Sequence, residues 1–218
     1  MKIKMTKEYT TLESRLKFTK EEIHSKGFCS FDGETAMQHY NAFYYLWDLI
    51  EDMRPNKLIE IGTAAGGLTR FLKCISDELN LNAKIISYDV NDNPARNKLL
   101  DIGVDYRQED CFDKKNEHNL YRLAHDISSE GKALVLCDGG HKITEFNKLA
   151  NFLKTGDVIM AHDYSSSRDV FKSEIHGKIW NWCEVTYEDI KNAVEKNNLK
   201  PHMSEKFSQA VWACFVKE

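Results

Sequence analysis

Amphipathic segments and short apolar runs alternate along most of the chain. Residues 36–53 form the first amphipathic segment, with apolar side chains at the spacing of one helix face: Phe43, Leu46, Trp47, Ile50 and Met53. Pro55 ends this predicted helix, and the apolar run 57–61 that follows is typical of a buried strand. Both patterns then repeat, predicting further helices at 68–79, 94–102, 120–128, 143–153 and 187–197, and further strands at 83–89, 104–108, 133–138, 157–162 and 209–216.

Strand-then-helix units in succession predict an α/β fold, with a parallel sheet covered by helices on both faces. In such sheets ligands bind beyond the carboxyl ends of the strands, so function should be sought in the residues that follow each strand. Residues 1–30 are charged and weakly periodic. We therefore expect an N-terminal helical arm at 1–32 and one domain at 33–218.

Composition narrows the possible classes of protein. The chain has 218 residues, enough to bury a full core, and a net charge of −4, which argues against a dedicated nucleic-acid binder. No apolar run approaches the roughly 20 residues of a membrane span, and the first residues lack the apolar region of a signal peptide. The six cysteines show no CxxC spacing. We expect a cytoplasmic protein with reduced core thiols and no membrane or nucleic-acid partner.

A glycine-rich turn follows the first strand. It contains Glu60, Gly62, Thr63, Gly66 and Gly67, and glycines at this place let the backbone approach a ligand at the start of the next helix. The turn is not a P-loop, because leucine stands at 68 where the lysine would be, and it is not GxGxxG, because position 64 is alanine. A tight strand–helix turn without a ligand is the alternative.

Acidic residues follow the second and third strands. Asp89 stands where a carboxylate can accept hydrogen bonds from both hydroxyls of a ribose. Glu109, Asp110 and Cys111 follow the third strand, where a carboxylate can accept from an adenine amino group. Either aspartate could instead cap a helix. Together with Glu60 they indicate a ligand that carries adenosine.

The fourth and fifth strands end in a second polar group. Asp138 and His141 follow the fourth strand, and His162 and Asp163 follow the fifth. Asp138, His162 and Asp163 could converge on a divalent cation, and His141 could accept a proton beside it. A hydrogen-bonded polar cluster without metal is the alternative.

With these residues in view, the chain resembles the class I S-adenosylmethionine (SAM)-dependent methyltransferases. Residues 57–67 resemble their motif I, Asp89 the ribose-binding acid and Asp110 the acid beside adenine. The C-terminal AVWACFVKE resembles their closing strand. The resemblance implies a Rossmann-like, mostly parallel sheet of seven strands with the last strand antiparallel.

A narrower resemblance is to the cephalosporin-hydroxylase-like and macrolide-sugar O-methyltransferase group. It rests on the segment from Gly33 to Gln38 and on Asp138-Gly-Gly-His141 followed by a late pair of polar residues. That pair is usually two acids, whereas here it is His162-Asp163. An imidazole at this place suits manganese, iron or zinc better than magnesium.

The resemblance implies O-methylation of a small hydroxylated acceptor, with a sugar-like molecule favoured. It implies a divalent cation (Mg or Mn) bound by Asp138, His162 and Asp163, with His141 as the catalytic base. The implied SAM-binding residues are Glu60, Gly62, Thr63, Gly66, Gly67, Asp89, Asp110, Cys111 and Asp138. A homo-oligomer is compatible with this function.

Three other functions stay open at this stage. A nucleotide-cofactor oxidoreductase could use the same sheet, although the missing second glycine of GxGxxG disfavours a pyrophosphate cradle. A non-catalytic SAM-binding protein would share the cofactor residues. A nucleic-acid methyltransferase is disfavoured, because the chain lacks the Asp/Asn-Pro-Pro-aromatic signature and is acidic.

Overall fold

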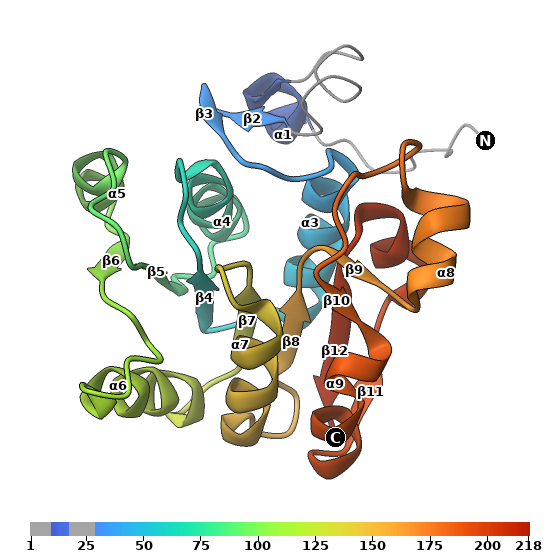
Figure 1. Cartoon of the computed structure of the whole chain (residues 1–218). Helices are drawn as coiled ribbons and strands as arrows, with labels where there is room; N and C mark the ends of the chain where they lie inside the picture. The colour runs from blue at the N-terminus through green and yellow to red at the C-terminus, as the bar shows by residue number, and fades with distance from the viewer. Residues whose placement is uncertain (1–9, 18–28) are drawn as a thin grey trace.

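A seven-stranded sheet forms the centre of the computed structural model, which describes residues 10–17 and 29–218 (Figure 1). Its strands are β4 (Lys57–Ile61), β5 (Lys84–Asp89), β6 (Asp105–Gln108), β7 (Ala133–Cys137), β8 (Val158–Ala161), β11 (Leu199–Pro201) and β12 (Ala213–Lys217). Their order is β11-β12-β8-β7-β4-β5-β6. Neighbouring strands from β8 to β6 are parallel, and β12 is antiparallel to β8 and β11. The predicted fold is therefore confirmed.

Helices cover both faces of this sheet, as Figure 1 shows. On one side lie α3 (Asn41–Met53), α4 (Gly67–Glu78) and α5 (Arg96–Asp101). On the other lie α6 (Glu117–Ser128), α7 (Lys142–Leu149) and α9 (Tyr187–Lys196). Apart from α3, which precedes β4, each of these helices connects strands of the sheet. The loops at the carboxyl ends of the parallel strands therefore gather at one edge.

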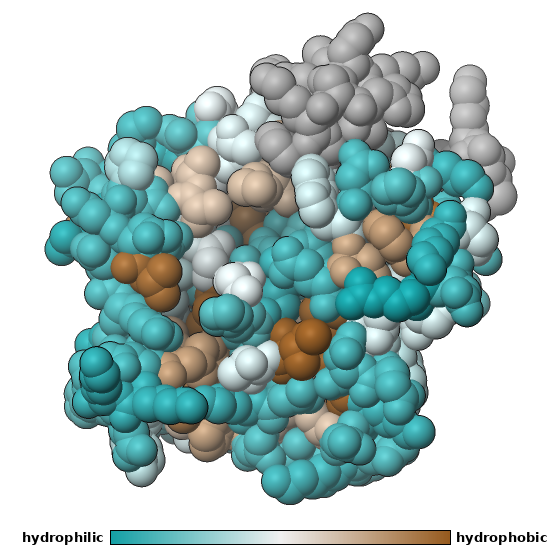
Figure 2. Space-filling model, in the orientation of Figure 1, coloured by the Kyte–Doolittle hydropathy of each residue, from teal (hydrophilic) through white to brown (hydrophobic). Residues whose placement is uncertain are grey.

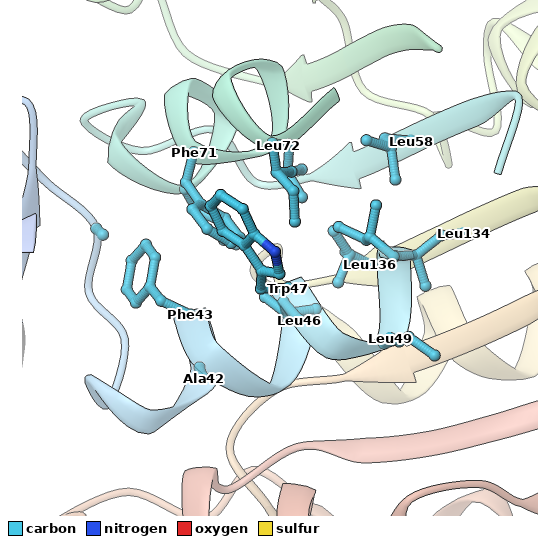
Figure 3. Close-up of a cluster of buried hydrophobic side chains, with 14 of the residues drawn as sticks. Ala42, Phe43, Leu46, Trp47, Leu49, Leu58, Phe71, Leu72, Leu134 and Leu136 are labelled. Carbon is cyan, nitrogen blue, oxygen red and sulfur yellow. The ribbon is translucent and has the colours of Figure 1, made fainter. Parts of the chain in front are cut away.

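The core is divided by the sheet into two apolar layers. Every residue of β4 is buried, and alternate side chains enter opposite layers: Leu58 packs under α3 and α4, whereas Ile59 faces α6 and α7. Figure 3 shows the first layer, where Leu46 and Trp47 from α3 meet Leu72 from α4. Because side chains on both faces of the sheet are buried, the sequences of the strands are continuous apolar runs.

Several element boundaries differ from the prediction. α3 begins at Asn41 rather than 36, because Met37 has a positive φ of 49° that no helix continues through. The last strand begins at Ala213 rather than 209, since Gln209 lies in a 3₁₀ turn. β11 was not expected. The remaining short elements are η1 (Ala150–Phe152), β9 (Tyr164–Ser165), α8 (Arg168–Val170), a π-helical turn η2 (Phe171–Ile175), β10 (Val185–Thr186), α10 (Ser204–Phe207) and η3 (Ser208–Ala210).

The described part of the N-terminal region packs on the domain. It comprises α1 (Thr10–Arg15) and a small antiparallel sheet of β1 (Leu16–Lys17), β2 (Ser30–Phe31) and β3 (Glu34–Thr35). Phe31 is fully buried, with its ring centroid 6.1 Å from that of Phe43 and 5.6 Å from that of Phe71. The rest of the predicted arm, 1–9 and 18–28, lies outside the described residues.

Hydrophilic residues cover most of the face drawn in Figure 2, and hydrophobic ones gather in a few patches near its middle. Among the described residues, five large hydrophobic side chains are exposed: Met37, Val90, Leu100, Tyr121 and Trp182. Within the same residues, no helix has the length and apolar character needed to cross a membrane. Five of the six cysteines are buried, and Cys183 is half-buried.

Candidate functional site

Two adjoining cavities open beyond the carboxyl ends of the parallel strands. The β5–β6 cavity, of about 530 Å³, is lined by Asp89, Asp110, Cys111, His141 and Glu145 among others. The β7–β8 cavity, of about 600 Å³, is lined by Glu60, Lys142, His162, Asp163 and Trp180 among others. Both are also lined by Gly62, Ala64 and Asp138, so they meet at the ends of β4 and β7. Three of the five exposed hydrophobic side chains, Met37, Val90 and Trp182, line these cavities.

The turn after β4 needs glycine for close backbone packing. Gly62 has a φ of 96°, and a Cβ there would lie 2.3 Å from the carbonyl oxygen of Asp138. A Cβ on Gly67 would lie 2.5 Å from the carbonyl oxygen of Glu34 in β3. Gly66, also at positive φ, precedes the first residue of α4. These glycines bring β7 and β3 against the turn, and Gly62 also forms part of the wall shared by the cavities.

Glu60 is buried beneath this turn. Its Oε2 accepts hydrogen bonds from Ser87, at 2.7 Å, and from Thr69, while Oε1 has no partner among the described residues. Burial raises the pKa of Glu60 to about 8, although both hydroxyls act in the opposite direction. Thr63 contributes its hydroxyl to the same network, 2.7 Å from that of Ser87. The carboxyl is therefore protonated near neutral pH. Glu60 is among the residues that line the β7–β8 cavity, and its unpartnered Oε1 is buried.

The predicted adenosine-side acids line one cavity, as expected from the order of the strands. Asp89 accepts hydrogen bonds from the backbone N–H of Ala64, at 3.0 Å, and of Asn91, at 2.9 Å. Asp110 is exposed and its Oδ1 accepts from the backbone N–H of Phe112 at 2.8 Å. Cys111 is buried at the cavity wall. Backbone amides thus hold both aspartates without neutralising their charge.

The loop after β7 is fixed by Glu145, from the first turn of α7. Its carboxylate accepts from the backbone N–H of Gly139, at 3.1 Å, and of His141, at 3.0 Å. His141 directly precedes α7, is exposed, and lines the β5–β6 cavity. The next residue, Lys142, lines the β7–β8 cavity instead. The structure therefore places His141 on the side of Asp89 and Asp110, not in the cavity that His162 and Asp163 line.

Asp138, His162 and Asp163 converge, as the sequence predicted. His162 Nδ1 donates to Asp138 Oδ1 at 2.9 Å and lies 3.8 Å from Asp163 Oδ1. Its ring lies between two indoles, with centroids 4.8 Å from Trp212 and 5.3 Å from Trp180. Trp180 also donates its indole N–H to Asp163 Oδ1 at 2.5 Å. The imidazole is thereby fixed in position by aromatic packing and by a carboxylate.

Sequence reasoning missed two residues of this cluster, Lys142 and Gln38. Lys142 Nζ lies 3.1 Å from Asp163 Oδ2, 2.9 Å from Glu184 Oε2 and 4.0 Å from Asp138 Oδ1. Gln38 donates its side-chain N–H to Asp138 Oδ2 at 2.6 Å. The indole N–H of Trp212 donates to Gln38 Oε1 at 2.8 Å, which fixes the amide in this orientation.

These contacts make the cluster an ion-paired network. Burial alone would lower the pKa of Lys142, but Asp138 and Asp163 raise it above its ordinary value. The pKa of His162 is also raised, because the same carboxylates outweigh its burial. Burial would raise the pKa of Asp163, whereas His162 and Lys142 lower it. The cluster thus contains charged groups of both signs.

The chain is similar to known proteins in structure but matches none by sequence. No protein-family model matches the sequence, and the search of curated proteins found no match. CmcI, in a structure with Mg and SAM, matches with a TM-score of 0.56 at 13% identity, over 85% of this chain and 75% of CmcI. A putative caffeoyl-CoA O-methyltransferase from Staphylococcus aureus matches with a TM-score of 0.53 at 12% identity, over 81% and 83% of the two chains.

A third match is the methyltransferase MycE from the mycinamycin biosynthetic pathway, in complex with Mg and SAH. The TM-score is 0.51 at 16% identity, over 80% of this chain and 48% of MycE. The chain has a methyltransferase fold. It spans three quarters of CmcI but only about half of MycE. At these identities the similarity establishes the fold, and the chemistry must be argued from the residues of this chain.

The side chains at the end of β7 and β8 do not fit a divalent cation as they stand. All four carboxylate oxygens of Asp138 and Asp163 already accept from or pair with Gln38, His162, Trp180 or Lys142. Over residues 10–17 and 29–218, no three His, Cys, Asp or Glu side chains are grouped so that they could hold a metal ion. The predicted cation at Asp138, His162 and Asp163 is not confirmed.

Proposed function

We propose that this chain is a SAM-dependent methyltransferase that methylates an oxygen of a small hydroxylated molecule. The observation that carries the proposal is the meeting of two cavities at Gly62, Ala64 and Asp138. One cavity presents acids suited to adenosine, and the other presents a polar cluster beside two tryptophans. A cofactor bound in the first cavity can direct a reactive group into the second, which is the arrangement that group transfer needs.

The residues of the β5–β6 cavity fit the adenosine part of SAM. Asp89 and Asp110 are held by backbone amides, so their charge is available to accept from ribose hydroxyls and an adenine amino group. Val90, which is 62% exposed, and Phe112 add apolar surface for a flat ring. Glu60 lines the adjoining β7–β8 cavity, and its Oε1, which has no partner among the described residues, would bind a polar group from the amino-acid end of the same molecule. Bound SAM would supply an activated methyl group.

The acceptor would occupy the β7–β8 cavity. Trp180 is buried in its wall, and Trp182 is 46% exposed at the same cavity. Indole faces combined with charged and hydrogen-bonding groups suit a hydroxylated ring, such as that of a sugar. The cavity's fixed side chains would orient the acceptor oxygen toward the shared wall at Gly62 and Asp138. Orientation of this kind can lower the barrier by about 7–11 kcal/mol.

His141 is our choice for the group that takes the acceptor proton. Of the two imidazoles at the cavities, His162 is buried with its Nδ1 committed to Asp138, whereas His141 is exposed and can pass a proton to solvent. His141 lines the β5–β6 cavity, which meets the acceptor's cavity at Asp138. A general base is worth about 10²–10⁴-fold in rate.

Calorimetric titration and a turnover assay test this function together. SAM and S-adenosylhomocysteine should bind with one site, and NAD should not. Release of S-adenosylhomocysteine should then be measured with a panel of sugars and catechols. Binding of NAD in place of SAM would favour an oxidoreductase, whereas SAM binding without turnover on any hydroxylated acceptor would favour a non-catalytic SAM-binding protein.

A further inference from the structure

We propose that the ammonium group of Lys142 is the cation of the β7–β8 cavity, standing where the resemblance implies a divalent metal. Its Nζ is within 4.0 Å of carboxylate oxygens from three segments: Asp138 after β7, Asp163 after β8 and Glu184 before β10. The side chains of Lys142, Asp138 and Asp163 are 8%, 13% and 9% exposed. The positive charge is therefore built into the chain.

The surrounding contacts leave little freedom for exchange with a metal ion. Asp138 is held by Gln38 and His162, and Asp163 Oδ1 by Trp180, so the oxygens that a metal ion would have to take over are Asp163 Oδ2 and Glu184 Oε2, both paired with Lys142. A divalent cation between them would stand next to the Lys142 ammonium, and like charges at such distances repel strongly. It would also have to break the ion pairs already formed.

The backbone of Lys142 is fixed as firmly as its side chain. Lys142 is the first residue of α7, and Glu145 in the same turn accepts from the backbone N–H groups of Gly139 and His141. The loop before α7 is thus held to the first turn of α7, and the Lys142 ammonium extends from this fixed backbone into the cavity. Such fixed charges act on a bound ligand without a cost of reorganisation.

The ammonium would bind the acceptor oxygen. Lysine has three N–H donors and no acceptor, and of the three carboxylates near it Glu184 is the most exposed, at 49%. Glu184 is the partner of Lys142 that a bound methyl-acceptor molecule can replace most easily. We assign Lys142 the donor to the acceptor's hydroxyl oxygen. This role rests on the proposed methyl transfer, but the exclusion of divalent metal by Lys142 does not.

Manganese binding tests the exclusion without any turnover. We would titrate metal-free protein with Mn²⁺, using calorimetry or the electron paramagnetic resonance of free Mn²⁺. The wild type and Asp163→Asn should bind Mn²⁺ equally, because Asp163 holds no metal in the wild type. Lys142→Ala should gain a saturable Mn²⁺ site, and the double variant Lys142→Ala/Asp163→Asn should lose it. Wild-type binding that Asp163→Asn abolishes would overturn the proposal, and so would a folded Lys142→Ala variant that binds no Mn²⁺.

If Lys142→Ala does not fold, the wild-type titration can still overturn the exclusion of divalent metal. Lys142→Met, with a side chain of similar length, is the second variant. The acceptor role is tested by kinetics. EDTA should leave wild-type turnover unchanged, and Lys142→Met should raise the KM for the acceptor at least tenfold while the Kd for SAM stays within threefold. Turnover abolished by EDTA would overturn the role. Failure to bind SAM would count against the proposed function and not against the Mn²⁺ result.

Discussion

The two cavities hold the aspartates predicted as site residues in different ways. In the β5–β6 cavity, Asp89 and Asp110 accept hydrogen bonds from neutral backbone amides. In the β7–β8 cavity, Asp163 pairs with Lys142, and Asp138 pairs with His162. The first arrangement orients negative charge and leaves it available to a ligand, whereas the second balances charge within the protein.

This difference assigns different tasks to the two cavities. Uncompensated acids that are fixed by the backbone can accept hydrogen bonds from neutral donors, such as the hydroxyl and amino groups of adenosine. A balanced ion-paired network changes little when a neutral ligand enters, and its task is to orient that ligand.

Replacing His141 tests whether the chemistry depends on a residue from the β5–β6 side. His141→Ala should lower kcat about 10²–10⁴-fold, because a general base is lost, while the Kd for SAM changes little. His125→Ala, an exposed histidine on α6, is the matched control and should keep full activity. The assay is release of S-adenosylhomocysteine with calorimetry alongside. Equal activity of the two variants would contradict the assignment of His141 as the general base and would favour His162 instead.

Glu60 is the exception in the β7–β8 cavity, since hydroxyl groups and no cation hold it. Its pKa in the folded protein, about 8, lies above the ordinary 4.5, so its contribution to stability is complete below pH 4.5 and is lost as the pH rises through 8. Between pH 4.5 and 9 the free energy of unfolding of the wild type should fall relative to Glu60→Gln, by at most about 5 kcal/mol.

Urea unfolding of both proteins at pH 5, 7 and 9 measures this difference. Glu195→Gln, on the exposed face of α9, is the control, and its difference from the wild type should not vary with pH. A constant difference for Glu60→Gln as well would show that Glu60 is ionised in the folded protein and has a partner that the contacts described above do not include.

Removing Asp163 should disturb the ion-paired network. Asp163→Ala takes away the carboxylate nearest to Lys142 after Glu184 and the acceptor of the Trp180 indole. Breaking a buried ion pair leaves a charge without its partner, and we expect a loss of about 3–5 kcal/mol of unfolding free energy. Asp169→Ala, at an exposed position in α8, should change the value by no more than about 0.5 kcal/mol. Similar losses for both variants would refute a balanced network.

The sequence predicted the β5–β6 cavity better than the β7–β8 cavity, for a physical reason. Asp89 is the last residue of β5 and Asp110 stands two residues after β6, so the order of parallel strands places them together. Lys142 directly follows His141, where the sequence pattern is typical of the exposed start of a helix. Asp138 is four residues away, but the other two partners, Asp163 and Glu184, are remote in sequence. No local pattern carries that information.

Gln38 and β11 were missed for related reasons. Gln38 falls within the predicted helix 36–53, but the positive φ of Met37 takes it out of the helix, and its side chain contacts Asp138 and Trp212. β11 has three residues, of which only Leu199 is buried, too few for a periodic signal. Both positions are determined by tertiary packing.

The smallest expected effect is on SAM affinity. Asp89→Asn keeps the shape of the side chain but removes its charge, and a hydrogen bond to a charged group contributes about 1.5–3 kcal/mol. The Kd for SAM should therefore rise about 10–100-fold by calorimetry. Asp101→Asn, on the exposed end of α5, should leave the Kd unchanged.

A variant from the other cavity makes this measurement a direct comparison. Glu184→Gln removes a charge of the same sign at the rim of the β7–β8 cavity, where Lys142 keeps Asp163 as its partner. If adenosine is recognised only in the β5–β6 cavity, Glu184→Gln should change the Kd for SAM by less than about threefold, because the charge is lost on the acceptor side. A loss equal to that of Asp89→Asn would mean that negative charge anywhere near the junction attracts the cofactor, and the two cavities would then form one electrostatic site.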